Sequence, residues 1–214
     1  MNRRAMPPTT PRTISRYVRY ALQATAIAAL SLALPACSPG ASDANAPLAG
    51  ARIGGPFTLV NKDGKTVHYS DFNGKYRILY FGYTFCPDVC PVDLQNLMQG
   101  YRLFAKDHPA VAKEVVPIFV SIDPARDTPQ VMGEYTANFG PQLVGLTGTA
   151  DQVARAAKEW AVYYKKRPGT SPQDYLMDHS RAMYLMGKDG KPIALLPGDK
   201  NGKNVAAEME KWIH

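Results

Sequence analysis

The chain has 214 residues, 45% of them hydrophobic, and a formal net charge of +7. Five of its 25 basic residues are arginines within the first 36 positions, where no acidic residue occurs, so their removal would leave 20 basic and 18 acidic residues and a net charge of +2. Because a nucleic-acid-binding domain usually carries a large basic excess, we expect no nucleic-acid partner.

The first 36 residues have the charge pattern of a secretion signal. An apolar run over residues 21–34 follows the arginines, and it is shorter than the roughly 20 residues that a membrane-spanning helix needs. The run ends in Leu34-Pro35-Ala36-Cys37, which is similar to a bacterial lipoprotein cleavage box. We therefore expect residues 1–36 to be a lipoprotein signal peptide, Cys37 to be lipidated, and the domain to be exported to the periplasmic face of a bacterial membrane. An ordinary secretion signal or an uncleaved anchor is the alternative.

Residues 37–52 are mostly small and polar, as in a flexible spacer, so we expect the folded domain over residues 53–214. Short apolar segments at residues 57–60 and 67–69 flank the pair Asp63-Gly64 and predict an N-terminal β-hairpin. Residues 77–81 are typical of a buried strand, and helical spacing follows up to residue 104. We expect this helix to begin at Pro91 with Asp93 in its first turn, and Cys86 and Cys90 to lie in the preceding loop or at the cap.

The remaining pattern alternates strands with helices. Residues 115–122 predict a second buried strand, parallel to the first, and residues 143–146 a further strand between helices at 128–139 and 149–160. Residues 181–187 and 192–196 predict a second hairpin, and residues 204–213 a last helix. Residues 165–172, which contain Lys165, Lys166 and Arg167, are expected to form a solvated loop that borders the site. The alternation predicts an α/β, thioredoxin-like three-layer sandwich with an N-terminal β-hairpin.

Cys86 and Cys90 are separated by three residues at the junction of the predicted strand and helix. A thiol beside exposed helix N–H groups has its thiolate stabilised, which makes it both nucleophilic and a better soft-metal ligand. A small structural disulfide is the alternative, although so short a loop constrains the unfolded chain little. Pairing these two leaves one of the three cysteines, and lipidation of Cys37 accounts for it.

Residues 123–129 follow the second buried strand and are expected near the cysteines. We expect them mainly to start a helix, with Thr128 as the N-cap and Arg126 paired with Asp127 across the loop. A role for Asp123 or Arg126 in tuning a thiol pKa or meeting a partner is the alternative.

Three motifs occur along the chain: Gly82-Tyr83-Thr84-Phe85-Cys86-Pro87-Asp88-Val89-Cys90-Pro91, Asp123-Pro124-Ala125-Arg126-Asp127-Thr128-Pro129 and Asp178-His179-Ser180. Together they resemble the Sco/SenC family, whose members are copper-binding, thioredoxin-fold proteins of cytochrome oxidase assembly. The resemblance extends from about residue 54 to the C-terminus. It implies that Cys86 and Cys90 are thiolate ligands and a redox-active pair, and that His179 is the third copper ligand. It also implies that the copper-site subunit of cytochrome c oxidase is the acceptor.

Two thiolates and one imidazole form a soft donor set that suits Cu(I) and can also hold Cu(II). Three ligands leave an exchangeable position, and binding requires thiolates, so copper loading and a Cys86–Cys90 disulfide exclude each other. A lone histidine is more often a hydrogen-bonded core or surface residue. For His179 the neighbouring carboxylate of Asp178 is expected as a candidate to orient the ring, although adjacent residues of a strand face opposite ways.

Four functions fit these residues. The first is a membrane-tethered copper chaperone that delivers copper to the binuclear site of cytochrome c oxidase, served by a periplasmic copper donor or thiol reductant. As a metallochaperone it is not expected to be an enzyme, with thiol–disulfide oxidoreductase activity as the alternative. The second is a thiol–disulfide reductase that keeps the acceptor cysteines reduced and needs only Cys86 and Cys90. A peroxiredoxin-like peroxidase, in which Cys90 resolves a sulfenate, fits less well. A copper sensor is the fourth.

Overall fold

The computed structural model describes residues 45–171 and 174–214. The predicted signal peptide, the lipidation site Cys37 and most of the predicted spacer lie outside the described residues. Within the spacer, Ala46 is buried and the backbone N–H of Leu48 donates to the carbonyl of Ile193 at 2.9 Å. Among the described helices, none has the length and apolarity needed to cross a membrane.

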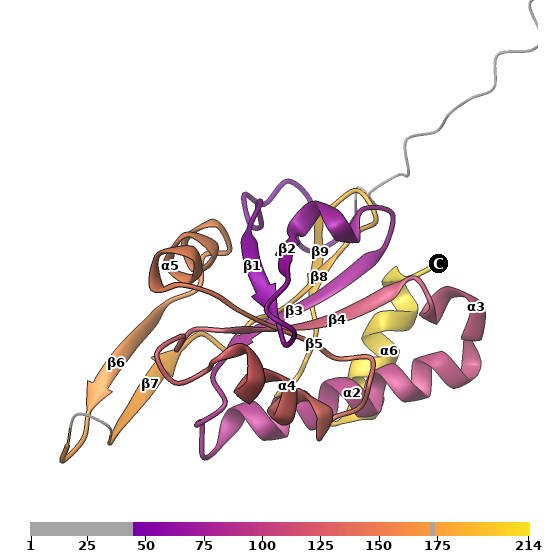
Figure 1. Cartoon of the computed structure of the whole chain (residues 1–214). Coiled ribbons are helices and arrows are strands. Elements are labelled where there is room, and N and C mark those ends of the chain that lie inside the picture. Colours follow the sequence, from indigo (N-terminus) through magenta and orange to yellow (C-terminus); the bar gives the residue numbers. More distant parts are fainter. Residues whose placement is uncertain (1–44, 172–173) are drawn as a thin grey trace, which may run out of the picture. The chain divides into compact units, whose positions relative to one another are not determined.

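A seven-stranded mixed sheet forms the centre of the domain, with the strand order β2-β1-β5-β4-β3-β8-β9 (Figure 1). Its strands are β1 (Thr58–Asn61), β2 (Thr66–His68), β3 (Tyr76–Gly82), β4 (Val115–Ser121), β5 (Val144–Thr147), β8 (Met183–Met186) and β9 (Pro192–Leu195). The three central strands β3, β4 and β5 are parallel, as expected, and β1 and β8 flank them in antiparallel orientation. The two predicted hairpins, β1–β2 and β8–β9, are both confirmed.

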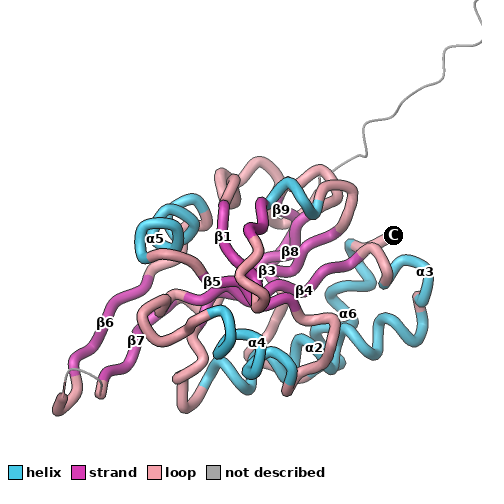
Figure 2. The backbone as a smooth tube through the Cα atoms, viewed as in Figure 1, coloured by secondary structure: helices cyan, strands magenta, loops and turns pink. Residues whose placement is uncertain are grey.

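Helices cover both faces of the sheet (Figure 2). They are α2 (Val89–Asp107), α3 (Pro109–Ala112), α4 (Pro129–Ala137), α5 (Ala150–Glu159) and α6 (Gly202–Trp212), with a short 3-10 helix η2 (Tyr69–Phe72). Consecutive residues of a strand point to opposite faces. The Tyr80 hydroxyl reaches Asp93 of α2 at 2.8 Å, whereas the Phe81 ring packs 6.0 Å from Trp160, which directly follows α5. Helices α2 and α5 therefore lie on opposite faces, which confirms the thioredoxin-like three-layer sandwich.

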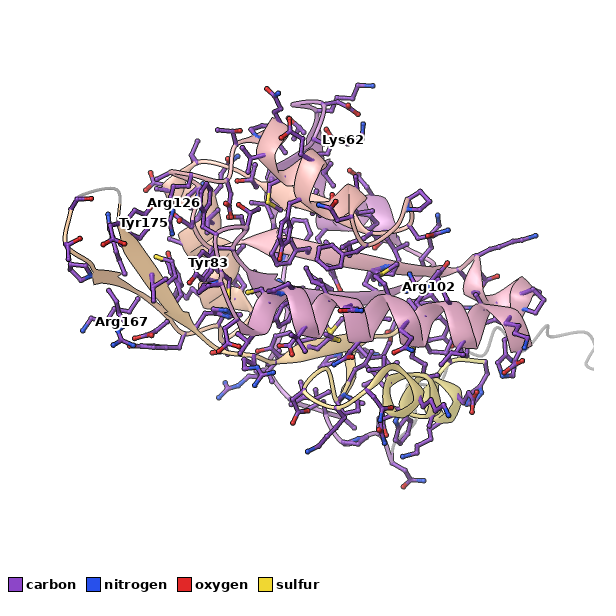
Figure 3. All side chains as sticks on the ribbon, turned by 90° about the horizontal axis from the view of Figure 1, so that it is seen from below. Lys62, Tyr83, Arg102, Arg126, Arg167 and Tyr175 are labelled. Carbon is purple, nitrogen blue, oxygen red and sulfur yellow. The ribbon has the colours of Figure 1, made fainter. Side chains whose placement is uncertain are left out.

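Helices α2 and α6 pack side by side along one face (Figures 1 and 3). Gly100 of α2 permits this close approach, because a Cβ atom there would lie 2.6 Å from the side chain of Val205 in α6. Strand β3 is buried along its whole length, as expected for a strand covered on both faces. The end of β3 and the start of α2 are thus held rigidly, and this junction carries the two cysteines.

The prediction of a solvated loop at residues 165–172 is wrong for residues 165–168, which belong to a strand of a β-ribbon, although they are exposed as predicted. Strands β6 (Tyr164–Pro168) and β7 (Tyr175–His179) form a separate two-stranded antiparallel sheet that projects from the central sheet (Figure 1). Four of the five β6 residues are exposed, so the strand lacks the alternating apolar pattern by which half-buried strands are found. Tyr164 pairs with His179, which places the histidine at the base of the ribbon.

Helix α2 begins at Val89 rather than at Pro91. Cys86 lies in the loop, as predicted, but Cys90 is already in the first helical turn. Pro91 is tolerated in this first turn because the first N–H groups of a helix have no partner within the helix. Asp93 therefore falls beyond the first turn and is buried, so the prediction that it lies in the first turn is wrong.

Candidate metal centre

Cys86, Cys90 and His179 come together at one end of the central sheet. Their ligand atoms, two sulfurs and an imidazole nitrogen, all lie within 4.8 Å of one another. The Sγ atom of Cys90 is 3.3 Å from Nε2 of His179. The three residues come from three elements: the loop after β3, the first turn of α2 and the last position of β7.

The three side chains differ in their access to solvent. Cys90 is completely buried, whereas Cys86 and His179 are partly exposed, and both cysteines are free thiols. A hollow of about 280 Å³ opens beside them and is lined by Cys86, His179, Leu176 and Arg181 among others. A metal ion or a thiol of another molecule can therefore approach from the side of Cys86 and His179, whereas Cys90 is buried and does not line the hollow.

The imidazole of His179 is oriented by the backbone. Its Nδ1 atom lies 2.8 Å from the carbonyl oxygen of Ser180, and since a carbonyl can only accept, Nδ1 carries the proton. The lone pair is then on Nε2, the atom that faces the Cys90 sulfur. Asp178 does not orient the ring as expected, because its carboxylate accepts a hydrogen bond from Arg167 across the ribbon at 3.3 Å.

Hydrogen bonds and burial give the thiols of Cys86 and Cys90 very different pKa values. The thiol of Cys90 donates to the Cys86 sulfur and, with smaller contributions from backbone N–H groups at the helix start, holds the pKa of Cys86 well below its usual range, although burial acts in the opposite direction. The backbone N–H of Cys90 is one of these donors, at 3.5 Å. The same hydrogen bond, together with burial, raises the pKa of Cys90. Cys86 is therefore the nucleophilic thiolate, and Cys90 is a protonated thiol in the metal-free protein.

Beneath Cys90 lies a buried polar network that the sequence analysis missed. The carboxylate of Asp93 accepts from the Tyr80 hydroxyl at 2.8 Å and from Arg181 at 2.6 and 3.1 Å. The Tyr80 oxygen is also 3.9 Å from the Cys90 sulfur. One signal was available in the sequence: Asp93 precedes Leu97 by four residues, so it falls on the buried face of the helix.

The loop at residues 123–129 holds the cysteine loop in place. Asp127 is fully buried and accepts hydrogen bonds from the hydroxyl of Ser121 and from both the hydroxyl and the backbone N–H of Thr84, two residues before Cys86. Arg126 does not pair with Asp127 as predicted; its Nε donates to Asp123 at 2.5 Å. Thr128 is the N-cap of α4, as predicted, and accepts from the N–H of Val131.

Arg126 connects the cysteine loop to the ribbon that carries His179. Its guanidinium lies 3.6 Å from the ring centroid of Tyr175 in β7 and 4.8 Å from that of Phe85, next to Cys86. Figure 3 shows Arg126 beside Tyr175 of the ribbon, with Tyr83 close by. Stacking of a guanidinium on aromatic faces is favourable, so this contact helps to keep the ribbon on the cysteine loop.

Comparisons with known proteins agree with these features. A family model described as SCO1/SenC matches residues 45–214. Protein SCO1 homolog, mitochondrial, of Homo sapiens is 38% identical over 157 residues, which are 73% of this chain and 52% of that protein. Protein SCO2, mitochondrial, of Saccharomyces cerevisiae is 43% identical over 157 residues, 72% of this chain and 51% of that protein. The chain thus spans about half the length of these relatives.

Solved structures give the same result at the level of the fold. The copper-bound structure of Bradyrhizobium japonicum ScoI is 38% identical with a TM-score of 0.68, and the match covers 75% of this chain and 99% of that one. The copper-bound structure of Arabidopsis thaliana ScoI is 38% identical with a TM-score of 0.69, over 74% of this chain and 96% of that one. From the family match and these likenesses, the chain is a member of the SCO1/SenC family.

Proposed function

We propose that this protein is a copper chaperone that binds copper through Cys86, Cys90 and His179 and delivers it during the assembly of cytochrome c oxidase. The observation that carries the proposal is the convergence of two sulfurs and one imidazole nitrogen within 4.8 Å. The two copper-bound relatives support it, since they share the fold at 38% identity.

The donor set fits copper as a cargo. Thiolate and imidazole ligands suit copper better than hard cations, and the proton on Nδ1 of His179 leaves Nε2 free to donate its lone pair. Three donors do not close the coordination of a metal ion as a four-ligand structural zinc site does. The hollow beside Cys86 and His179 supplies the side from which the ligands of an acceptor can replace them.

The location in the cell is inferred from the N-terminal sequence, and the partners are inferred from the family resemblance. We infer that Cys37 is acylated and tethers the domain to the periplasmic face of a bacterial membrane, and that the acceptor is the copper-site subunit of cytochrome c oxidase. A periplasmic copper donor or a thiol reductant would prepare the site for loading. Mass spectrometry of the membrane-bound protein tests the tether: an acylated N-terminal Cys37 supports it, and an intact or differently cut N-terminus contradicts it.

A thiol–disulfide reductase is the second candidate, favoured by the unequal thiols. The half-exposed Cys86 thiolate would attack a disulfide of the acceptor and form a mixed disulfide. Cys90 would then lose its proton and attack Cys86, which releases the acceptor as a dithiol and leaves a Cys86–Cys90 disulfide. This cycle oxidises the protein and reduces the acceptor by two electrons, and it does not need His179.

Transfer to the acceptor separates the two candidates. The reduced, copper-loaded domain is mixed with the metal-free soluble domain of the oxidase subunit in its reduced form, and the reduced, copper-free domain is mixed with the same subunit domain in its oxidised form. A chaperone forms the binuclear copper absorption with the reduced acceptor. Reduction of the oxidised acceptor with no copper transfer to the reduced one would overturn the chaperone in favour of the reductase.

A further inference from the structure

The carboxylate of Asp93 joins the part of the chain that carries Cys90 to the part that carries His179. Asp93 lies on α2, three residues after Cys90, and Arg181 lies two residues after His179 in the segment that leads into β8. The Nη2 atom of Arg181 is 2.6 Å from one carboxylate oxygen of Asp93, and its Nε atom is 3.1 Å from the other. Two parallel hydrogen bonds to a carboxylate fix direction as well as distance.

Few other polar contacts connect these two parts of the metal centre. Ser180 exchanges hydrogen bonds with Tyr163, but this ties the histidine segment to the ribbon and not to the cysteine helix. In the described part of the chain, the hydrogen bonds and ion pairs between α2 and residues 179–181 are those from Arg181 to Asp93 and the contact between Cys90 and His179 itself. The ion pair is therefore the polar contact that holds the two ligands together before metal binds.

We propose that the Asp93–Arg181 ion pair, which we call the strut, sets the separation of Cys90 and His179. Asp93 and Arg181 are then positioning residues of the copper site. The inference rests on the proposed copper function. Neither residue is a copper ligand in it, since a carboxylate is a hard donor and that of Asp93 is already engaged by Tyr80 and Arg181.

The two ends of the strut differ in burial. The Asp93 side chain is 1% exposed and that of Arg181 is 44% exposed, so the carboxylate is the fixed end and the guanidinium the end that solvent reaches. Arg181 also lines the hollow beside Cys86 and His179. A buried carboxylate that loses its cation is left with an unpaired charge, so the pair is expected to keep its geometry in the metal-free protein.

The strut also reaches the cysteine side of the site through Tyr80. A phenol has one proton, and the short contact to Asp93 takes it. The same hydrogen bond holds the Tyr80 oxygen in place, 3.9 Å from the Cys90 sulfur. Asp93 thus constrains the surroundings of both Cys90 and His179 from beneath the site.

The test compares Arg181→Gln, Arg181→Lys and Asp93→Asn with the wild type in anaerobic copper titrations. As a matched control, Lys188→Gln removes an ion pair to Glu114 at the other end of β8, and the Lys188 side chain is 41% exposed, much like that of Arg181. Loss of an outer partner of a metal ligand typically weakens metal binding about 10- to 100-fold, and we expect this for Arg181→Gln, with a shifted Cu(II) charge-transfer band. Arg181→Lys keeps the charge but not the two-point geometry, so it should restore part of the affinity.

A second readout needs no copper. In the reduced, metal-free protein, amide hydrogen exchange at residues 179–181 should be faster in Arg181→Gln than in the wild type and unchanged in Lys188→Gln. If Asp93→Asn fails to fold, the Arg181 variants still test the strut, because the Arg181 side chain is half-exposed and its replacement is less disruptive to folding. Affinity, spectrum and exchange of Arg181→Gln equal to the wild type would overturn the strut. A wild type that binds no copper would instead overturn the proposed function, and hydrogen exchange would then test the strut alone.

Discussion

The sulfur of Cys90 lies 3.3 Å from Nε2 of His179, although 89 residues separate them in the chain. The strand order accounts for this meeting. Strand β8 follows His179 and pairs antiparallel with β3, with Met183 opposite Tyr80. The start of β8 and the carboxyl end of β3 therefore lie at the same end of the sheet, and the cysteine loop leaves β3 at that end. The fold itself thus assembles the donor set.

The two thiols should react very differently with an alkylating reagent. The pKa of Cys86 is lowered, mainly by the hydrogen bond from Cys90, so this residue remains a thiolate below the ordinary thiol pKa of about 8.5. Its reaction with iodoacetamide should keep a level rate between about pH 6 and pH 8, whereas an ordinary cysteine reacts more slowly as its thiolate is lost in acid. Cys90, buried and with a raised pKa, should remain unmodified in the folded protein.

Peptide mapping by mass spectrometry after short exposure measures both rates. The urea-unfolded protein is the control, and there both cysteines should react with the same steep rise toward alkaline pH. Equal labelling of the two cysteines in the folded state would contradict the assignment of Cys86 as the nucleophile.

Substitution of Gly82 by alanine should displace the buried sulfur. A Cβ atom at this position would lie 2.7 Å from Cys90 Sγ and 2.9 Å from the ring of Phe119. We expect a stability loss of about 1–3 kcal/mol, as for other overpacked cores, together with weaker copper binding. Gly145→Ala is the matched control, because its Cβ would meet Thr136 of α4 at 2.9 Å. It should destabilise similarly and leave copper affinity unchanged; equal copper affinity in both variants would speak against the prediction.

Asp127 should be important for stability because it serves three donors inside the protein. Asp127→Ala leaves two hydroxyls and the Thr84 N–H without this acceptor, and each unsatisfied buried group costs about 1–3 kcal/mol. We therefore expect a loss of about 3 kcal/mol or more in urea unfolding, and a smaller loss for Asp127→Asn, which retains one acceptor oxygen. A loss below about 1 kcal/mol for the alanine variant would show that the loop is held by other contacts.

The stability difference between the wild type and Asp127→Asn should depend on pH. Burial raises the pKa of Asp127 above its value in the unfolded chain. Stability from such a group is fully present below the unfolded pKa and is lost as pH rises through the folded pKa. The difference in free energy of unfolding between wild type and Asp127→Asn should therefore increase in favour of the wild type from pH 7 toward about pH 4. A difference that is constant or shrinks on acidification would contradict this.

Trp160 should matter for stability but not for copper. It is fully buried on the sheet face opposite α2, against Tyr69, Phe81 and Tyr184. Trp160→Ala should cost about 3–5 kcal/mol. Trp160→Phe should cost clearly less, since among the described residues the indole Nε1 has no hydrogen-bond partner to lose. Thermal or urea unfolding measures both costs, and altered copper affinity in Trp160→Phe would show that the two faces are coupled.

The sequence was sufficient for the elements whose signals are local. Strand β3 was found because a strand covered on both faces is a continuous apolar run, and the N-cap Thr128 because its partners are neighbours in the chain. The N-terminal hairpin follows from an Asp-Gly pair between apolar segments. In each case the residues that decide the structure lie within a few positions of one another.

The features that were missed depend on contacts between distant residues. The ribbon strand β6 is exposed, and its pairing with β7 leaves no periodic signal in its own sequence. The partners of Asp93 are Tyr80 and Arg181, 13 and 88 residues away. Likewise the ring of His179 is fixed by the Ser180 carbonyl, a backbone group that no side-chain pattern reveals. The three-dimensional structure is needed to show which hydrogen-bond donor pairs with each buried acceptor.

An anaerobic copper titration of the reduced protein decides whether the three donors bind copper, with wild type compared with His179→Ala and with His108→Ala as the control. His108 lies beyond the far end of α2, where its ring packs on Phe104. We predict one tightly bound copper in the wild type and in His108→Ala, and loss or strong weakening of that copper in His179→Ala. Equal copper binding in all three proteins would contradict the Cys86, Cys90 and His179 site.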